Sequence, residues 1–402
     1  MNLTKRIIEL SNQYESHTLD LRRAIHRHPE LSSQEKETSA LVRLELERIG
    51  IPYTLSPVEP GVVAEIDSGR PGRLLLLRAD MDALPIQEAT GLPFASEVKG
   101  VMHACGHDVH TANLLAVAEI LWNTKDAWNG RVKLVFQPAE ELGGGGRQMV
   151  EKGLLDELPD ACFALHVMPT TPGVFTVASG PLTAYSDSFF ITVHGVAAHS
   201  STPEQGIDAI NIAAAIITAM NTIVARNLNP LETSTLNIGV MSGGTATNII
   251  ADTAQLNGMM RNATPEARAA MFKRIEEIAK GTAAMMGGSA DVRFKNGYAS
   301  VYNNERLADL ISGFYAEHET DLFDGISADG RAPENWMLTG NRFMLAAEDF
   351  GFYTQKVPSC LIWIGTGGNA PNHNPGFMVE EPYIKLCTRA MALFAAEFLT
   401  SD

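Results

Sequence analysis

The sequence has little positive charge relative to its negative charge. Its 402 residues include 31 Lys and Arg against 47 Asp and Glu, a formal net charge of −16 at pH 7. No basic patch offsets phosphate charge, so we expect no nucleic-acid partner and no anionic-membrane surface. A small anionic substrate remains compatible, because one buried Arg can bind one carboxylate.

Cysteines are few, and long apolar runs are missing. The four cysteines, Cys105, Cys162, Cys360 and Cys387, are too widely spaced for a disulfide framework, which favours reduced thiols in a cytoplasmic protein. Residues 1–31 contain no apolar core ahead of a small-residue cleavage site, so no secretory signal is predicted. No window reaches about 18 consecutive apolar residues, so no membrane span is predicted.

The pattern of apolar residues predicts an α/β fold. Amphipathic helices are expected at residues 3–25 and 33–49, and Gly50 should end the second one ahead of Pro52. Helical stretches such as 110–123 and 145–155 then alternate with short runs of Val, Leu, Ile and Phe. Those runs are residues 61–66, 73–81, 131–141 and 161–168. Continuous apolar strands alternating with helices indicate a largely parallel sheet covered on both faces.

The segment from residue 183 to 297 has a different pattern. It is read as strand, helix, two strands, helix and strand, and this βαββαβ order is typical of a ferredoxin-like unit. From residue 298 the α/β pattern resumes, with residues 361–368 as the last strand. We therefore predict a catalytic domain of residues 1–182 and 298–402, interrupted by an inserted satellite domain of residues 183–297.

Charged residues follow several of the apolar strands. Asp80 and Asp82 end one strand, Glu140 and Glu141 end another, and His166 lies near the end of a third. Open parallel sheets place their sites at the carboxyl ends of strands, so these groups should converge on one crevice. Carboxylates without a functional role are expected on solvated helix faces instead.

Residues 102–110, MHACGHDVH, form the densest cluster of potential metal ligands. Its candidates are His103, Cys105, His107, Asp108 and His110. Thiolate and imidazole bind borderline metals, whereas Mg²⁺ or Ca²⁺ would use oxygen ligands. In an extended loop, Cys105 and His107 would point to the same side. For Asp108 and His110, capping of the following helix is a reasonable alternative to metal binding.

Two further positions extend the candidate site. Because neighbouring side chains diverge, one of Glu140 and Glu141 could bind metal while the other acts as general base, and the residues alone leave the assignment open. His373 lies in a loop rich in Pro and Gly after the last strand. A lone loop His is often a surface residue, but its place behind a strand end makes a functional role equally reasonable.

Eight motifs, in this order, resemble the M20 metallopeptidase family, in its branch of amidohydrolases that act on N-acyl amino acids. They are RADMDALP, HACGHDVH, QPAEE, LHV, GVAAHSSTPEQGIDA, TNIIADTA, AEDFGFY and HNP. The resemblance covers almost the whole chain. It implies a zinc-peptidase-like catalytic domain with a mostly parallel sheet, and an inserted dimerisation or lid domain.

The resemblance also implies a dinuclear centre with two divalent metal ions per subunit, of Zn, Mn, Co or Ni. The five implied metal ligands are Cys105, His107, Glu141, His166 and His373. Cys105 would link the two ions, and Glu140 would be the general base. Arg78 stands where other branches have a metal-binding His, so Asp80, assigned to the catalytic set, either binds metal or orients a ligand.

In the satellite domain the resemblance implies three more site residues. His199 corresponds to a His that reaches the active site across a homodimer interface, and Asn248 and Arg261 correspond to positions that hold the substrate carbonyl and carboxylate. A donor such as His199 suits the oxyanion of a tetrahedral intermediate, and an Arg fork suits a free carboxylate. An exposed strand-end Arg without function is the alternative for Arg261.

These observations predict metal-dependent hydrolysis of the amide bond of a small N-acylated amino acid or related amide. The products would be a carboxylic acid and an amino acid. Peptide-bond cleavage of the dipeptidase or aminopeptidase type is the enzymatic alternative. A metal-dependent binding protein without catalysis is the second alternative, and it would be expected to lack some of the site residues found here.

Overall fold

The computed structural model describes residues 2–327 and 330–400. The chain forms two units. The first comprises Met1–Leu182, Tyr302–Arg342 and Asp349–Asp402, and the second comprises Thr183–Val301 and Phe343–Glu348. The inserted unit thus extends to residue 301, whereas the sequence placed its end at residue 297. Residues 343–348, which the sequence assigned to the catalytic domain, belong to the second unit.

The first unit contains an eight-stranded mixed sheet. In sheet order its strands are β1 (Tyr53–Leu55), β2 (Val62–Asp67), β4 (Arg131–Gln137), β3 (Leu74–Asp80), β5 (Ala161–Met168), β16 (Ser359–Gly365), β6 (Phe175–Thr176) and β15 (Met337–Leu338). The central strands β4, β3, β5 and β16 pair in parallel, whereas β1, β2 and β6 join through antiparallel pairs. The predicted α/β fold with a mostly parallel sheet is confirmed.

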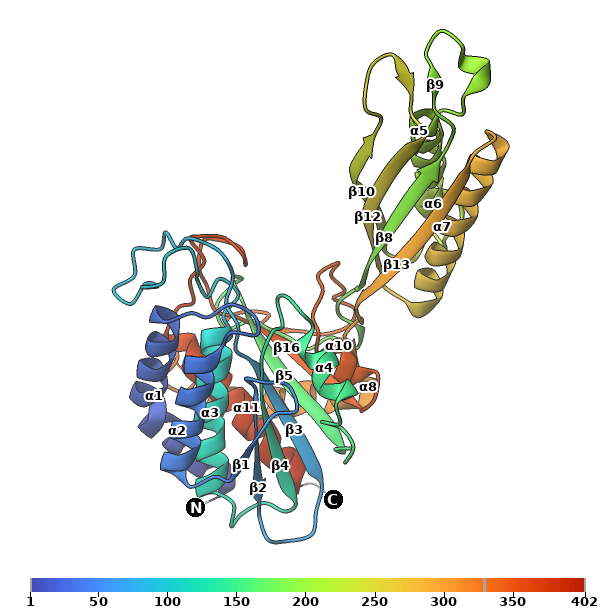
Figure 1. Ribbon diagram of the computed structural model, residues 1–402. Coiled ribbons are helices and arrows are strands. Elements are labelled where there is room, and N and C mark those ends of the chain that lie inside the picture. Colours follow the sequence, from blue (N-terminus) through green and yellow to red (C-terminus); the bar gives the residue numbers. More distant parts are fainter. Residues whose placement is uncertain (1, 328–329, 401–402) are drawn as a thin grey trace. The chain divides into compact units, whose positions relative to one another are not determined.

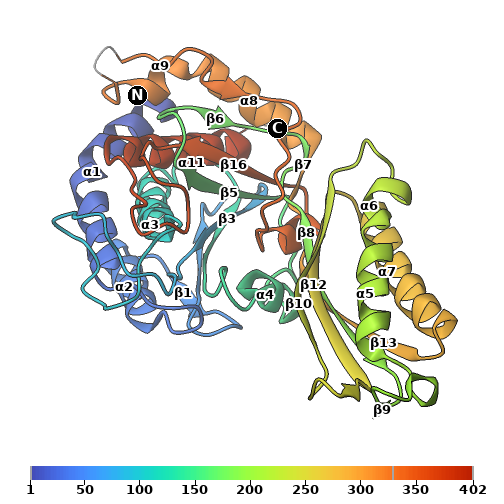
Figure 2. The ribbon, with the colours of Figure 1, turned by 90° about the horizontal axis from the view of Figure 1, so that it is seen from above.

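Both faces of this sheet are covered. Every residue of β3 and β16 is buried, as expected for strands without a solvated face. Helices α1 (Leu3–Arg27), α2 (Lys36–Ile49) and α3 (His107–Asn123) gather on one side of the sheet, and α4 (Gly145–Glu151) lies on the other (Figures 1 and 2). Nearly all of α3 is buried, so its first residue is held firmly against the strand ends.

Local signals explain where the helices begin and end. The side chain of Asn2 accepts the Lys5 N–H at 2.9 Å and caps α1. As predicted, α2 ends at Gly50, which adopts the left-handed conformation with φ 90°. Helix α11 (Pro382–Thr400), buried along most of its length, was not among the predicted helices, since an all-round apolar helix lacks an amphipathic stripe. Shorter elements complete the unit: β7 (Gly180–Pro181), β14 (Tyr302–Asn303), α8 (Glu305–Glu317), α9 (Glu319–Phe323) and α10 (Gly351–Thr354).

The second unit contains a four-stranded antiparallel sheet in the order β10-β12-β8-β13. Its elements along the chain are β8 (Tyr185–His194), α5 (Ala209–Met220), α6 (Thr222–Arg226), β10 (Ser234–Gly243), β12 (Thr253–Asn262), α7 (Pro265–Met285) and β13 (Ser289–Tyr298). Helices α5 and α7 cover one face of this sheet (Figure 2). The βαββαβ order is the predicted ferredoxin-like one. A small pair, β9 (Ala198–His199) and β11 (Ile249–Ile250), and a 3₁₀ turn at Pro203–Gln205 complete the unit.

One stretch among the described residues, Ala209–Arg226, is apolar and long enough by composition to cross a membrane, which is weak evidence on its own. In the structure it is divided into α5 and α6. The 12 residues of α5 span roughly 18 Å, less than the roughly 30 Å of a bilayer core. Its residues Ile212, Ala213 and Ile216 are buried in the core of the second unit, as in the core helix of an α/β domain.

Candidate active site

The ends of the central strands and the start of α3 bring the predicted metal ligands of the first unit together. Cys105 and His107 converge because Gly106 turns the chain between them with φ 89° and His107 opens α3. A Cβ at Gly106 would lie 2.2 Å from Val167 Cγ2, so only glycine fits this approach. The two side chains therefore converge, although not through the extended loop that their spacing of two residues would suit. A left-handed turn produces the convergence instead.

Two groups of possible ligands share Cys105. In one, the ligand atoms of Cys105, His107 and His166 all lie within 4.8 Å of one another. In the other, the same holds for Cys105, Glu141 and His373. Cys105 Sγ lies 3.4 Å from His166 Nε2, and His373 Nε2 lies 3.2 Å from Glu141 Oε1. A thiol common to two such groups has the position required of a bridging ligand.

Hydrogen bonds decide which imidazole nitrogens can bind a metal. His107 Nδ1 lies 3.1 Å from Asp82 Oδ1, and His166 Nδ1 donates to the Val167 carbonyl at 2.7 Å. Burial lowers the pKa of His166, so its neutral ring carries the proton on Nδ1 and keeps the lone pair on Nε2. Burial opposes protonation of His107, but the nearby Asp80 and Asp82 raise its pKa, and a His107 ring that gives up one proton to bind a metal keeps its other proton on Nδ1. Metal-binding histidines are commonly oriented by carboxylates and carbonyls in this way. His107 and His166 both have the tautomer that a metal ligand needs.

His110 has no lone pair to offer. Its Nε2 accepts the Val167 N–H at 2.9 Å, which places the ring proton on Nδ1, and Nδ1 lies 2.6 Å from Asp80 Oδ1. The other oxygen of Asp80 accepts from Arg78 Nη1. Burial favours the neutral acid, but Arg78 and the imidazoles keep the pKa of Asp80 well below its usual value. Asp80 is therefore an anion engaged by Arg78 and His110.

Asp82 is the carboxylate that orients the candidate metal ligand His107. The sequence placed Asp82 among the charged residues at the strand ends, but it did not assign Asp82 a catalytic or metal-binding role. Its Oδ1 accepts from His107 Nδ1 and from the Glu140 N–H at 3.1 Å. Its Oδ2 accepts the Glu141 N–H at 2.9 Å. Burial opposes ionisation, but the bond from His107 lowers the pKa of Asp82. The available signal was its position, since Asp82 follows the end of β3 at Asp80 by two residues.

Glu140 and Glu141 lie in the turn that follows β4. Glu140 is 6% exposed, and its Oε1 accepts the Asp349 N–H at 3.3 Å. Glu141 Oε1 is buried and has no hydrogen-bond partner among the described residues, although His373 Nε2 is near. Ligand atoms of His107, Glu140 and Glu141 also lie within 4.8 Å of one another. The two carboxylates thus reach the same small volume, and Glu141 is the one that faces His373.

The donor set fits metal ions. Nε2 of His107 and Oε1 of Glu141 are buried without hydrogen-bond partners in the part of the chain that the structure describes, an arrangement that destabilises a protein unless something binds there. Burial and the nearby Glu141 raise the pKa of Cys105, so a thiolate at this position requires a cation. Cys105 and Glu141 together raise the pKa of His373 to about 10, another sign of negative surroundings. Sulfur, nitrogen and oxygen donors in this combination suit borderline divalent metals.

The remaining polar residues of the 102–110 segment lie outside these two groups. Asp108 Oδ2 accepts from Arg22 Nε and contacts His26 Nδ1, both at 2.8 Å, so Asp108 is bound to α1 and does not have the predicted alternative role of capping α3. His103 is buried, and burial lowers its pKa to about 4. Neither of its ring nitrogens has a hydrogen-bond partner among the described residues.

The other three predicted residues lie in the second unit. His199 Nδ1 accepts the Ser201 N–H at 3.2 Å, so a neutral His199 ring carries its proton on Nε2 and presents it as a donor. The carbonyl of Asn248 accepts the Ser200 N–H at 3.1 Å. Arg261, on β12, donates from Nη1 to the Leu345 carbonyl at 2.6 Å and so ties residues 343–348 to this unit.

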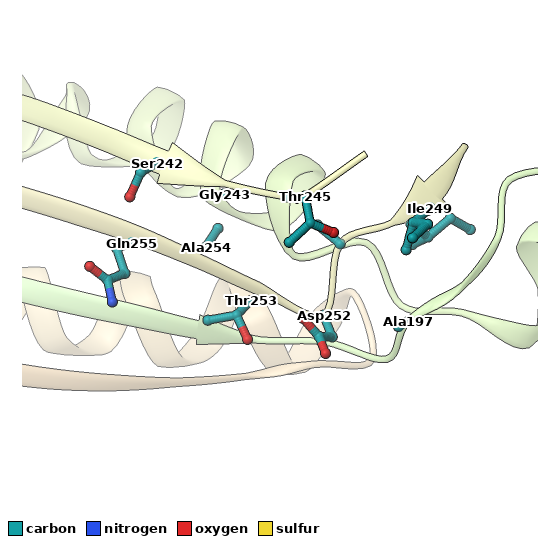
Figure 3. A pocket seen from close by; sticks show the side chains of 12 residues that line it. Ala197, Ser242, Gly243, Thr245, Ile249, Asp252, Thr253, Ala254 and Gln255 are labelled. Carbon is teal, nitrogen blue, oxygen red and sulfur yellow. The ribbon is translucent and has the colours of Figure 1, made fainter. Parts of the chain in front are cut away.

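A hollow of about 490 Å³ lies at the end of the second unit, next to β9 and β11. Figure 3 shows Ser242 of β10 and Gln255 of β12 on its wall, with Asp252 and Thr253 at the start of β12. Ala197, Ile249 and Ile250, which flank the strand of His199, also line it. The strand of the exposed His199 therefore lies next to a concave surface lined by both polar and apolar residues.

Most of the chain matches one known protein family. Residues 76–397 match the peptidase family M20/M25/M40. The chain belongs to this family. The M20 match includes both Cys105-centred groups, and it extends through the inserted unit to α11.

Relatives of the chain within the M20 family are named as hydrolases. It is 36% identical over 371 residues to an N-acetyl-L-cysteine deacetylase of Bacillus subtilis (strain 168), covering 92% of this chain and 85% of that one. It is 35% identical over 408 residues to thermostable carboxypeptidase 1 of Saccharolobus solfataricus, covering 99% of both. A solved M20 structure from Bacillus subtilis, described as a dinuclear metal-binding peptidase, is 33% identical with a TM-score of 0.83, covering 96% of this chain and 99% of that one.

Proposed function

We propose that this protein is a dinuclear-metal hydrolase that cleaves the amide bond of N-acylated amino acids or related small amides. The products are a carboxylic acid and an amino acid. The observation that carries the proposal is the pair of ligand groups sharing Cys105, with the Glu140 carboxyl close to His107 and Glu141. Membership of the M20 family and the similarity to an N-acetyl-L-cysteine deacetylase support the choice of substrate class.

The proposed ligands divide between two ions. Cys105, His107 and His166 would hold one ion, and Cys105, Glu141 and His373 would hold the other. When bound, the ions supply positive charge that polarises the acyl carbonyl and lowers the pKa of water toward about 7. Zn²⁺, Mn²⁺, Co²⁺ and Ni²⁺ are all compatible with this donor set.

Glu140 is the proposed general base. It takes a proton from the attacking water and returns a proton to the leaving amine, which is the role of a positioned carboxylate. The Asp349 N–H holds one of its oxygens, and Asp82 holds its backbone N–H. Both contacts fix the carboxylate before substrate arrives, so little reorganisation is needed during the reaction.

The second unit supplies the proposed substrate contacts. His199 donates its Nε2 proton to the oxyanion of the tetrahedral intermediate, a role its tautomer supports. Asn248 holds the acyl carbonyl, and Arg261 offers a guanidinium fork to the free carboxylate of the amino acid. We propose that His199 acts on the active site of the partner subunit in a homodimer.

The surface of the second unit supports a dimer. Strand β10 lies at an edge of its sheet, with backbone groups available for a neighbour. Large apolar side chains around it are 39–50% exposed: Ile210, Val240, Met241 and Ile249. We also propose a cytoplasmic location, which the four unpaired, buried cysteines support.

Peptide cleavage is the second candidate function, favoured by the similarity to a thermostable carboxypeptidase. A panel of N-acetyl- and N-benzoyl-amino acids and dipeptides, assayed with metal-loaded protein, separates the two. Chelation should abolish activity, and Mn²⁺, Co²⁺, Zn²⁺ or Ni²⁺ should restore it. Faster turnover of dipeptides would replace the first proposal with the second. Full activity in protein shown to be metal-free by elemental analysis would refute both.

A further inference from the structure

The backbone of the turn that carries Glu140 and Glu141 is hydrogen-bonded by side chains from other segments of the chain. Four successive backbone N–H groups, those of residues 139–142, each donate to a side-chain oxygen. The acceptors are Glu35 Oε1 for Ala139 at 2.7 Å, Asp82 Oδ1 for Glu140 at 3.1 Å, Asp82 Oδ2 for Glu141 at 2.9 Å and Ser32 Oγ for Leu142 at 3.1 Å. The turn is therefore shaped by residues far from it in the sequence.

Glu35 is the unusual member of this set. It is fully buried at the start of α2, and its Oε2 has no hydrogen-bond partner among the described residues. Burial raises the pKa of its carboxyl to about 7, although the Ala139 N–H favours the ionised form. Burying a carboxyl without a cationic partner is unfavourable. The hydrogen bond that joins Glu35 to a distant segment is the one from the Ala139 N–H.

Ala139 needs such a partner because its backbone is strained. Its φ is 57°, a left-handed conformation that disfavours residues with a Cβ. Its carbonyl accepts the Gly145 N–H at 2.9 Å, so its N–H and its carbonyl are both held. The φ and ψ of Ala139 set the direction in which the next residue, Glu140, leaves the turn.

We propose that Glu35 is a positioning residue for the hydrolytic reaction. By holding the Ala139 N–H it keeps Ala139 left-handed and aims the Glu140 carboxylate at the site of the attacking water. Glu35 acts through the backbone and contacts neither substrate nor the reacting atoms. This inference rests on the proposed function, because it assigns Glu140 as the base.

Two substitutions at Glu35 separate its hydrogen bond from its volume. Glu35→Gln keeps an oxygen that accepts the Ala139 N–H, whereas Glu35→Leu removes the acceptor at similar size. Glu30→Gln and Glu30→Leu are matched controls, because Glu30 also accepts backbone N–H groups at the start of α2, from Glu37 at 3.0 Å and Thr38 at 2.9 Å. The control contacts do not involve the turn after β4.

With metal-loaded enzyme and an N-acetyl-amino acid that the wild type hydrolyses, Glu35→Leu should lower kcat by about 10²-fold, a loss typical of a misplaced catalytic group. KM and metal content should stay near wild type. Glu35→Gln should recover most of kcat, and the Glu30 variants should match the wild type. Hydrogen exchange of residues 139–142, followed by mass spectrometry, should be faster in Glu35→Leu and near normal in Glu35→Gln.

Ala139→Gly provides a second route to the answer, because glycine adopts positive φ without strain. Combined with Glu35→Leu, it should recover part of kcat, and it also covers the case in which Glu35→Leu alone folds poorly. Three outcomes would overturn this inference and leave the proposed function standing. They are an unchanged kcat in Glu35→Leu, an equal loss of kcat in Glu35→Leu and Glu35→Gln, and a loss of kcat that is explained by an equal loss of metal. A wild type that hydrolyses no amide on the panel would instead overturn the proposed function and this inference with it.

Discussion

Replacing each of the two neighbouring glutamates by glutamine should give two different defects. Glu140→Gln keeps an oxygen able to accept the Asp349 N–H, and the backbone contact to Asp82 is unchanged. The fold and both proposed ligand groups should therefore survive, while the base is lost. Glu141→Gln removes the only carboxylate from the group formed with Cys105 and His373, so that ion should be lost or weakly held.

The two variants should differ in how much kcat and how much metal they lose. General-base catalysis contributes about 10²–10⁴-fold, so Glu140→Gln should lower kcat by that factor, equivalent to about 3–5 kcal/mol of transition-state stabilisation. Its metal content should equal that of the wild type. Glu141→Gln should bind about one ion per subunit in place of two, and added metal should restore part of its activity.

Steady-state kinetics and elemental analysis of the same preparations decide the matter. Equal thermal midpoints would show that neither substitution acts through unfolding. The reasoning would be refuted if Glu140→Gln emptied the site while Glu141→Gln kept both ions, because the two roles would then be reversed.

Three further predictions use other contacts of the site. Cys105 should react with a thiol reagent in metal-free protein and be protected by bound metal, as followed by mass spectrometry; equal labelling in both states would argue against a thiolate ligand. Asp82→Asn should weaken metal binding by about 10–100-fold in competition with a chelator, because His107 loses the carboxylate that orients it; unchanged affinity would contradict that role. Co-refolding Glu140→Gln with His199→Ala should restore about a quarter of wild-type activity, because half the dimers are mixed and each has one intact site if His199 acts across the interface. If His199 acts within its own subunit, mixing should restore nothing.

The sequence predicted the order of elements well where each segment had one dominant pattern. β5, for example, is apolar except for His166, and residues 161–168 form the strand with the predicted bounds. Helix α7 has Thr264 as its cap and Pro265 in its first turn, and both are local signals. The neighbouring strands β6 and β15, at one edge of the eight-stranded sheet, were not predicted. Each has two residues, too few to show an alternation of apolar and polar side chains.

Within the site, residue types were predictable, but the partners of each residue were not. MHACGHDVH left a structural role for His110 open, but it did not show its partner: the Val167 N–H, from β5, occupies His110 Nε2. In the same way, Asp80 ends β3 and Asp82 follows two residues later, and only the folded chain shows that Asp82 binds His107 Nδ1 while Asp80 binds His110 Nδ1. Such contacts come from segments far apart in the chain.

Glu35 illustrates the same limit. In the sequence it is one acid among several at the start of an amphipathic helix, where acids are favoured by the helix dipole. Only the folded chain brings its carboxyl to the Ala139 N–H, which is more than a hundred residues away.

The two connections between the inserted unit and the first unit lie side by side, which affects how the insertion can arise and how it can be removed by engineering. β7 and β14, on either side of the insertion, pair with each other. At the base of the insertion, the Thr183 carbonyl accepts from the Ser300 hydroxyl, and the Thr183 hydroxyl oxygen accepts the Val301 N–H. The host chain therefore leaves and returns at adjacent points, as it would around a tight turn. A domain that enters and leaves at one place adds little loop-closure entropy to its host, so insertion at this point could be tolerated in a single genetic event. By the same reasoning, replacing residues 183–301 by a two-residue turn should leave the eight-stranded sheet able to form, while residues 343–348 would lose the hydrogen bonds that their carbonyls accept from Ala184 and Arg261.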